Sequence, residues 1–229
     1  MSEEAIHAIR QKYTEYTFLY NNEALEDIGN TAEAVQISKL CGAMIEFKIP
    51  DEEDIADNVA VLGIVIDKSN QQIVGATTGY IEDDSINDIT ECAGGARGIG
   101  EYLRYFCLLK AHLEDSRIVK ISGGISGGIP PLVEGDSPAA KVEKSERLLK
   151  YHVNRGASIV IDEHGNNVFT YDIADILIKI SNLGKPDGGI RKSKKKLVYH
   201  KRHKKSKRRK KKSKRRKKKS KRHKKSKHL

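Results

Sequence analysis

The sequence lacks any long hydrophobic segment. Nowhere in its 229 residues does an apolar run reach the roughly 18 residues that a transmembrane helix requires. The first residues, Met1-Ser2-Glu3-Glu4, are acidic, and the apolar core of a secretory signal does not follow them. We therefore expect no membrane partner and an intracellular location.

Cysteine is also scarce. The chain has three cysteines, Cys41, Cys92 and Cys107, and their spacing does not match a metal-ligand pattern. An odd number of cysteines outside a disulfide-rich framework favours reduced thiols in a reducing compartment. We expect all three to be core or unreactive thiols and expect no metal site.

Acidic residues are missing from the last part of the chain. The sequence has 43 Lys and Arg against 31 Asp and Glu, yet residues 191–229 hold 26 of the basic residues and none of the acidic ones. The formal charge is therefore −14 for residues 1–190 and +26 for residues 191–229. The sequence predicts an acidic globule that carries a strongly basic tail.

The tail has no apolar residue between Tyr199 and Leu229, although its basic clusters repeat every seven residues over 202–222. A repeat without an apolar seam cannot form a coiled coil, so we expect residues 191–229 to be disordered. Their charge density favours salt-sensitive binding to DNA or RNA, without base stacking because no aromatic residues are interleaved with the basic clusters. A nuclear-localisation signal or a solubilising extension is the alternative. Serines in the repeats resemble kinase sites: Ser206, Ser213, Ser220 and Ser226.

A glycine-rich stretch, Gly94-Gly95-Ala96-Arg97-Gly98-Ile99-Gly100, runs directly into a predicted helix over residues 99–114. Glycines allow close approach of the backbone to a ligand, and a helix start offers unpaired amide groups. With the charge of Arg97, the combination suits a phosphate or pyrophosphate. The alternative is a flexible loop before an ordinary amphipathic helix.

The remaining patterns predict a mixed α/β fold with a largely antiparallel sheet flanked by helices. The expected helices are 3–13, 23–43 with a break at 29–31, 99–114 and 138–155. The expected strands are 16–20, 44–49, 59–67, 72–81, 86–92, 118–122, 157–162 and 167–171. Residues 173–183 are apolar and ambiguous between helix and strand. We divide the chain into a folded domain (1–183), a linker (184–190) and the basic tail (191–229).

This order of elements over residues 59–171 resembles the GNAT superfamily of acetyl-CoA-dependent N-acetyltransferases. Two segments carry the resemblance: Ile89-Thr90-Glu91 leading into residues 95–100, and Leu148-Leu149-Lys150-Tyr151-His152-Val153-Asn154-Arg155-Gly156. The family's pyrophosphate loop reads Gln/Arg-x-x-Gly-x-Gly/Ala, and Gly98-Ile99-Gly100 supplies its glycine end. Gly95 departs from the family's Gln or Arg, and Ala157 replaces its Phe.

The resemblance implies acetyl-CoA as cofactor. Its pantetheine arm would lie along the strand at 86–92, where that strand splays from the strand at 118–122, and its pyrophosphate would bind the amides of residues 95–100. The residues implied in cofactor binding are Ile89, Glu91, Gly95, Ala96, Arg97, Gly98, Ile99 and Gly100.

Direct transfer of an acetyl group requires a base for the amine, and Glu91 and Asp88 are the candidates. A solvated position at the strand end is the alternative for both, and we favour it for Asp88. Tyr151 or His152 would protonate the departing thiolate. Only one of them can face the site, because adjacent helix residues point about 100° apart; packing in the core is the other interpretation of His152.

These features favour an N-acetyltransferase that acts on an amine. The acceptor would be a protein lysine or N-terminus in a basic protein, the tail itself, or a small amine such as a polyamine. The alternative is a nucleic-acid-binding or packaging protein whose GNAT fold is catalytically silent. A homodimer that includes the hairpin at 157–171 stays open, and nuclear or nucleic-acid-associated localisation follows from the tail.

Overall fold

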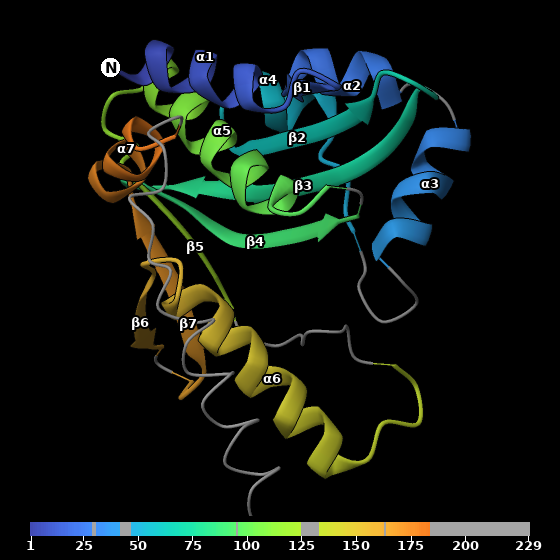
Figure 1. The fold of residues 1–229 in the computed structure, drawn as a ribbon, viewed down its shortest axis with the longest axis vertical. Helices are drawn as coiled ribbons and strands as arrows, with labels where there is room; N and C mark the ends of the chain where they lie inside the picture. The colour runs from blue at the N-terminus through green and yellow to red at the C-terminus, as the bar shows by residue number, and fades with distance from the viewer. Residues whose placement is uncertain (29–30, 42–46, 95, 125–132, 163, 184–229) are drawn as a thin grey trace, which may run out of the picture. The chain divides into compact units, whose positions relative to one another are not determined.

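The computed structural model describes residues 1–28, 31–41, 47–94, 96–124, 133–162 and 164–183. Helices and strands follow one another along these residues in the order shown in Figure 1. The helices are α1 (Ser2–Lys12), α2 (Asn22–Ile28), α3 (Thr31–Cys41), α4 (Glu52–Ala56), α5 (Ile99–Glu114), α6 (Pro138–Val153) and α7 (Ile173–Ser181). The strands are β1 (Tyr16–Tyr20), β2 (Ala60–Asp67), β3 (Gln72–Glu82), β4 (Ser85–Ala93), β5 (Lys120–Gly124), β6 (Ser158–Ile161) and β7 (Asn167–Asp172).

The strands form one seven-stranded sheet in the order β1-β2-β3-β4-β5-β7-β6. Every neighbouring pair is antiparallel except β4 and β5, which are parallel. A parallel pair needs a crossover connection, and α5 supplies it. The structure therefore confirms a mixed α/β fold with a largely antiparallel sheet and flanking helices.

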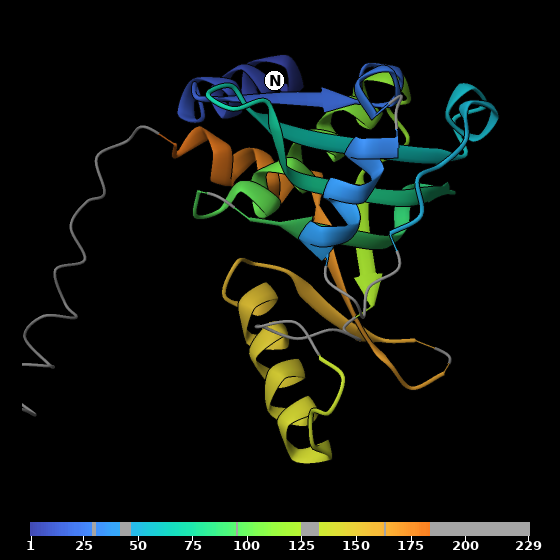
Figure 2. The same ribbon diagram turned by 90° about the vertical axis from the view of Figure 1, so that its right-hand side faces the viewer.

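Helices cover both faces of the sheet, and the core has two parts. α1, α5 and α7 pack on one face, whereas α2, α3 and α4 pack on the other; Figure 2 shows α3 lying across the face opposite α5. The strand β2, second from one edge of the sheet, is buried along nearly its whole length, and its residues alternate between the two parts. A strand that is buried on both faces has a nearly continuous run of apolar, β-branched residues in its sequence, and for this reason the sequence predicted β2 well.

One predicted strand in the middle of the chain was wrong, and the segment left ambiguous near its end is a helix. Residues 47–49 of the strand predicted at 44–49 have no regular structure, and the rest of that segment lies outside the described residues. The short helix α4 follows instead, with the Asp51 side chain accepting a hydrogen bond from the backbone N–H of Asp54 at 2.8 Å. This capping bond satisfies a free amide of the first turn. The ambiguous segment after residue 172 is the helix α7, capped in the same way by Asp172.

The expectation of three reduced thiols was wrong for two of the cysteines. Cys41, at the end of α3, and Cys92, on β4, form a disulfide with their Cα atoms 4.9 Å apart. The two residues are 51 positions apart and meet only because α3 packs against β4. Cys107 on α5 is buried and free, as expected, and burial raises the pKa of its thiol.

Among the residues that the structure describes, no helix combines the length and the apolar character needed to cross a bilayer. The predicted linker and the basic tail, residues 184–229, lie outside the described residues.

Candidate functional site

A bulge in β4 determines which face of the sheet receives the Glu91 side chain. Tyr80 of β3 pairs with Asn87 and Thr78 pairs with Thr90, so β4 has one residue more than β3 over this interval. Asp88, within the bulge, adopts a left-handed backbone with φ +50°. Because side chains alternate along a strand, the extra residue reverses the alternation. Glu91 therefore points toward α5, on the same side as Ile86.

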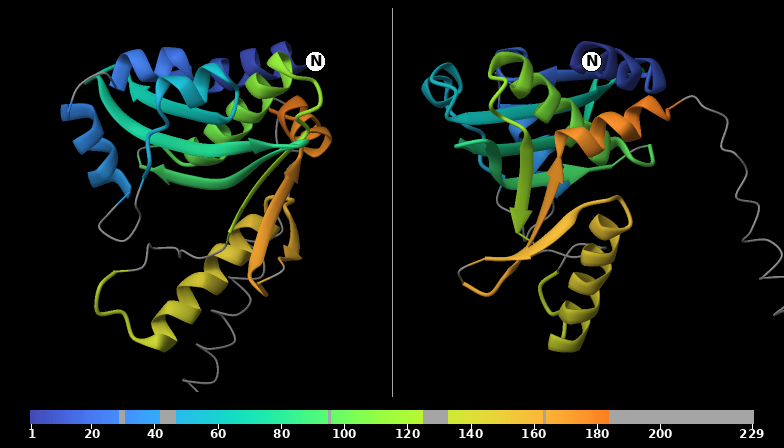
Figure 3. Two further views of the ribbon diagram at one scale, coloured as in Figure 1. Left: turned by 180° about the vertical axis from the view of Figure 1, so that it is seen from behind. Right: turned by 90° about the vertical axis from the view of Figure 1, so that its left-hand side faces the viewer.

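β4 and β5 pair only at their first residues. Their parallel register consists of Ser85 opposite Lys120 and Ile86 opposite Ile121, although β4 continues to residue 93. A side-chain bond between Ser122 and Asn87 (2.7 Å) extends the contact by one step. Beyond it, β5 and β7 run side by side away from β4 (Figure 3). Within the described part of the chain, the outer edge of β4 therefore has no strand partner from residue 87 onward.

The glycine-rich stretch connects this free edge to the start of α5. It begins with the backbone N–H of Gly94 donating to Val74 O (2.8 Å), and the Tyr13 hydroxyl donates to Arg97 O (3.2 Å). Gly98 has φ +91°, a left-handed conformation that glycine adopts without steric cost, and no side chain caps the helix there. The backbone N–H of Ile99 donates to Ala96 O (3.2 Å), whereas the amides of Gly100 and Glu101 have no acceptor among the described residues and are available to an external one.

Glu91 lies between this turn and a buried arginine. Its Oε2 accepts a hydrogen bond from Arg104 Nε at 2.7 Å, and its Oε1 lies against Gly100. A Cβ atom on Gly100 would be only 2.4 Å from that oxygen, so no larger residue fits there without moving the carboxylate. The Glu91 side chain is 19% exposed, whereas that of Arg104 is 1% exposed.

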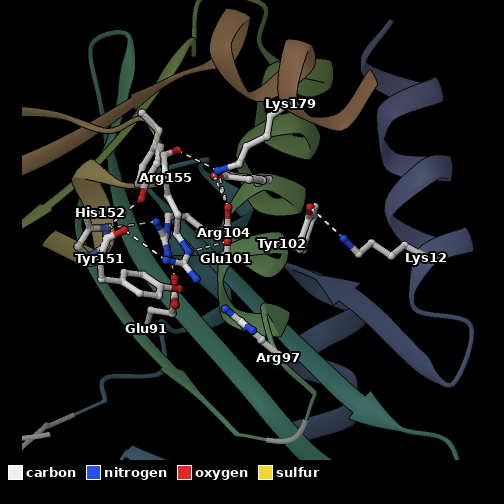
Figure 4. A network of polar contacts seen from close by, with 12 residues as sticks. Lys12, Glu91, Arg97, Glu101, Tyr102, Arg104, Tyr151, His152, Arg155 and Lys179 are labelled. Atoms are coloured by element: carbon white, nitrogen blue, oxygen red, sulfur yellow. Dashed lines mark hydrogen bonds and ion pairs between the residues drawn. The ribbon is translucent and has the colours of Figure 1, made fainter. Parts of the chain in front are cut away.

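Arg104 extends from α5 toward the opposite end of the sheet. Its guanidinium lies over the rings of Tyr171 (4.8 Å) and Phe169 (5.4 Å) on β7, and its Nη1 is 3.5 Å from His152 Nδ1 on α6. Burial lowers the pKa of Arg104, but the negative charge of Glu91 outweighs this and raises it overall. One positive side chain thus connects α5, β4, α6 and β7 (Figure 4).

His152 is held in its neutral form. Its ring stacks on Phe169 with centroids 3.8 Å apart, and the Tyr171 hydroxyl is 3.0 Å from its Nδ1. Burial, together with the charges of Arg104 and Arg155, lowers its pKa to about 3. Arginine can only donate, so Nδ1 is the acceptor and the ring proton is assigned to Nε2.

Tyr151, the next residue on α6, faces a different environment from His152. The Arg155 guanidinium lies 3.6 Å from the centroid of its ring, and its side chain extends toward Glu91 in Figure 4. Burial and the negative charge of Glu91 raise the pKa of its hydroxyl. The phenol is therefore protonated at neutral pH.

A second polar cluster fixes the start of α5 to α7 and the end of α6. Glu101, which is buried, accepts hydrogen bonds from Tyr105 (2.9 Å) and Arg155 (2.7 Å) and pairs with Lys179 (2.5 Å). Burial opposes ionisation of Glu101, but Lys179 and these donors lower its pKa overall. This cluster holds Arg155 over the ring of Tyr151.

The structure brings together most of the residues that the sequence singled out. Glu91 and Tyr151 approach one another, and Gly98, Ile99 and Gly100 form the start of α5 beside them. Ala96 and Arg97 lie in the turn, with Arg97 exposed, whereas Gly95 is outside the described residues. Ile89 is partly buried against the core beneath α5. Asp88 is exposed in the bulge, which fits the solvated position favoured for it.

The sequence analysis missed two residues of the cluster, Arg104 and Tyr171, and it predicted only one role for a third, Gly100. Arg104 is a charged residue in a helix, and charged residues usually face solvent. Tyr171 lies near the end of β7, in a segment with no motif of its own, and Gly100 was interpreted as a phosphate-binding glycine only. The available signal was in β4, where the apolar residues Ile86 and Ile89 are three positions apart and so indicate a bulge.

Comparisons with known proteins gave matches only among solved structures. No protein-family model matches the chain. No curated protein matches it either.

Among the solved structures, 37 chains match, and they include several acetyltransferases. An apo structure of FdhC, described as a nucleotide-linked sugar GNAT, is 10% identical with a TM-score of 0.36, covering 73% of this chain and 93% of its own. An aminoglycoside 6'-N-acetyltransferase in complex with coenzyme A is 13% identical with a TM-score of 0.43, covering 69% and 97%.

The ribosomal-protein-S18-alanine N-acetyltransferase of Escherichia coli is 9% identical with a TM-score of 0.38, covering 68% of this chain and 90% of its own. Identities of 9–13% and TM-scores of 0.36–0.43 are too low to transfer a substrate or the role of a residue to this chain.

Proposed function

We propose that the folded part of this chain is an acetyl-CoA-dependent N-acetyltransferase. The observation that carries the proposal is the continuity of three features: the unpaired edge of β4, the uncapped glycine turn, and the carboxylate of Glu91 between them. An extended amide-containing chain can pair with a free strand edge, and a phosphate group can bind at an uncapped helix start. Coenzyme A contains both groups in one molecule.

The residues of the turn fit such a cofactor. Gly98 has a left-handed backbone at the start of α5, the amides of Gly100 and Glu101 have no acceptor among the described residues, and Ala96 adds little bulk. Arg97 is exposed and brings a positive charge to the turn. Along β4, the backbone of residues 87–93 would hold the pantetheine arm. When bound, acetyl-CoA supplies an acetyl group activated as a thioester.

We assign the proton transfers to two side chains. Glu91 accepts the proton that an acceptor amine loses as its nitrogen bonds to the acetyl carbon. Tyr151 donates its hydroxyl proton to the sulfur as the carbon–sulfur bond breaks, and the proton on Glu91 returns to the Tyr151 oxygen through solvent. His152 has a pKa of about 3 and no acidic proton near neutrality, so we assign it a positioning role.

The acceptor is an amine of a protein or of a small molecule. Residues 1–190 have a formal charge of −14, which raises the local concentration of a cationic acceptor. Basic proteins, including the chain's own tail, and polyamines are cations of this kind. Mass spectrometry of the chain after incubation with acetyl-CoA tests the tail as acceptor, because acetylation of its lysines increases its mass.

Calorimetric titration of acetyl-CoA into the full chain at high salt tests donor binding, because salt screens the tail. We expect binding that Arg97→Glu weakens. Arg117→Glu makes the same charge change just beyond the opposite end of α5, at a position that is 83% exposed, and should bind as the wild type does. Absence of binding by the wild type would refute the enzyme and leave the catalytically silent scaffold.

We also propose that residues 191–229 bind nucleic acid. Their 26 basic residues and lack of acidic ones support binding through phosphates. The affinity for a DNA or RNA duplex should fall steeply and linearly on a log–log plot against salt concentration, with little dependence on sequence. Deletion of 191–229 should abolish this binding while leaving acetyl-CoA binding intact. Equal affinity in the deleted chain would contradict the assignment.

A further inference from the structure

Arg104 has one nitrogen without a hydrogen-bond partner. Its Nε donates to Glu91 and its Nη1 approaches His152, but Nη2 has no partner among the described residues although it is fully buried. The whole residue is 0% exposed, so bulk water does not reach this nitrogen. An unpaired donor of a charged group inside a protein is costly, and native structures rarely contain one without a reason.

The geometry of the guanidinium shows where this donor points. The group is planar, and Nη2 is the terminal nitrogen on the same side as the Nε–H bond. Because Nε donates to Glu91 Oε2, one N–H of Nη2 is directed to the same side, beside the carboxylate. Figure 4 shows the side chain of Arg104 next to that of Glu91, with Tyr151 alongside.

Glu91 does not use this second donor. Arginine and a carboxylate often form two parallel bonds, but only the Nε–Oε2 bond is present here. The other oxygen, Oε1, lies against Gly100 instead. The rings of Phe169 and Tyr171 lie against the guanidinium, and the Tyr171 hydroxyl interacts with it, but Nη2 itself has no hydrogen-bond partner among the described residues. The donor therefore remains free on the side of the candidate base.

We propose that Arg104 Nη2 donates a hydrogen bond to the carbonyl oxygen of the acyl thioester, making Arg104 a catalytic residue of the transfer. The inference rests on the acetyltransferase function proposed above. A neutral oxygen fits better than an anion, because Glu91 already balances the charge of Arg104 and would repel a second negative group. As negative charge develops on that oxygen, a positive donor in a site of low dielectric constant stabilises it without reorganisation.

The test compares acetyl-CoA with free coenzyme A by calorimetry on the full chain. The two ligands carry the same phosphates, so any binding by the basic tail cancels in the ratio of their dissociation constants. Arg104→Lys keeps the positive charge beside Glu91 but removes Nη2. We expect this variant to lower the preference for acetyl-CoA over coenzyme A roughly tenfold, which corresponds to one hydrogen bond to a charged group. An unchanged preference would overturn the proposal.

Infrared spectroscopy of the wild-type chain provides a second measurement that needs no variant. Acetyl-CoA labelled with carbon-13 at the acetyl carbonyl should show a lower carbonyl stretching frequency when bound than when free. A band at the free frequency would refute the hydrogen bond even if Arg104→Lys fails to fold. If neither acetyl-CoA nor coenzyme A binds to the wild type, the proposed function itself has failed. If both bind and the band is unshifted, only the role of Arg104 has failed.

Discussion

The neutral, buried His152 should make the fold sensitive to acid. Its pKa is lowered from 6.5 to about 3 by burial and by Arg104 and Arg155, and its side chain is only 4% exposed. Below pH 6.5 the unfolded chain takes up a proton on this residue and the folded chain does not, so stability falls as the pH decreases. The loss ends near pH 3, where the folded form also becomes protonated.

The shift determines the size of this effect. At 1.36 kcal/mol per pH unit, lowering the pH from 7 to 4.5 should remove roughly 2.5 kcal/mol of unfolding free energy, and the full shift limits the loss to about 5 kcal/mol. Urea unfolding at a series of pH values measures it, as the difference between the wild type and His152→Phe. The variant keeps a ring to stack on Phe169 but cannot titrate, so its fixed packing cost does not depend on pH.

An equivalent substitution at an exposed histidine is the control. His7→Phe on α1 should show the same pH dependence as the wild type, because this side chain lies on the surface. If His152→Phe loses stability with acid as steeply as the wild type does, His152 is not buried in a neutral form. The assignment of its proton to Nε2 would then be wrong as well.

Two further predictions concern the packing around Glu91 and the disulfide. Gly100→Ala places a methyl group 2.4 Å from Glu91 Oε1, so urea unfolding should show a loss of about 1–3 kcal/mol in unfolding free energy. In the control Gly124→Ala the new methyl group meets nothing within 4 Å, and the unfolding free energy should stay within about 0.5 kcal/mol of the wild type. Equal losses in the two variants would contradict the clash. Reduction of the Cys41–Cys92 disulfide should lower the unfolding free energy by up to about 4 kcal/mol, since it closes a loop of about 50 residues. Cys41→Ser should make unfolding in urea insensitive to dithiothreitol, and a reductant effect of the same size in this variant would contradict the prediction.

The sequence predicted the sheet well where strands are buried on both faces or alternate clearly. β2 and β3 are examples, because their β-branched runs are bounded by turn residues. It failed at residues 44–49, where alternation over a few residues resembled a strand and the structure has none at 47–49. Short helices such as α4 depend on one capping bond, which a periodicity analysis does not detect.

The candidate site could be predicted only in part. The glycine turn and Glu91 were visible because a motif links them along the chain. Arg104 was hidden because α5 was interpreted as one-sided, whereas twelve of its sixteen residues are buried. A helix buried on nearly all sides gives no sequence signal for which of its charged residues lies inside.

The ion pair between the buried Arg104 and the partly buried Glu91 is difficult to explain by stability alone. Removing two charges from water costs free energy that their attraction barely recovers, and apolar pairs of similar volume often stabilise a fold as well or better. Arg104 nevertheless keeps its charge in the interior with one donor unused. Glycine is required at position 100 because a side chain there would collide with the Glu91 carboxylate. The bulge at Asp88, which needs a left-handed backbone, directs Glu91 to the face of the sheet that α5 covers. The unpaired donor of Arg104, the glycine at position 100 and the bulge at Asp88 each cost stability, and all three lie around the Glu91 carboxylate. Chemistry at Glu91 explains them better than packing does.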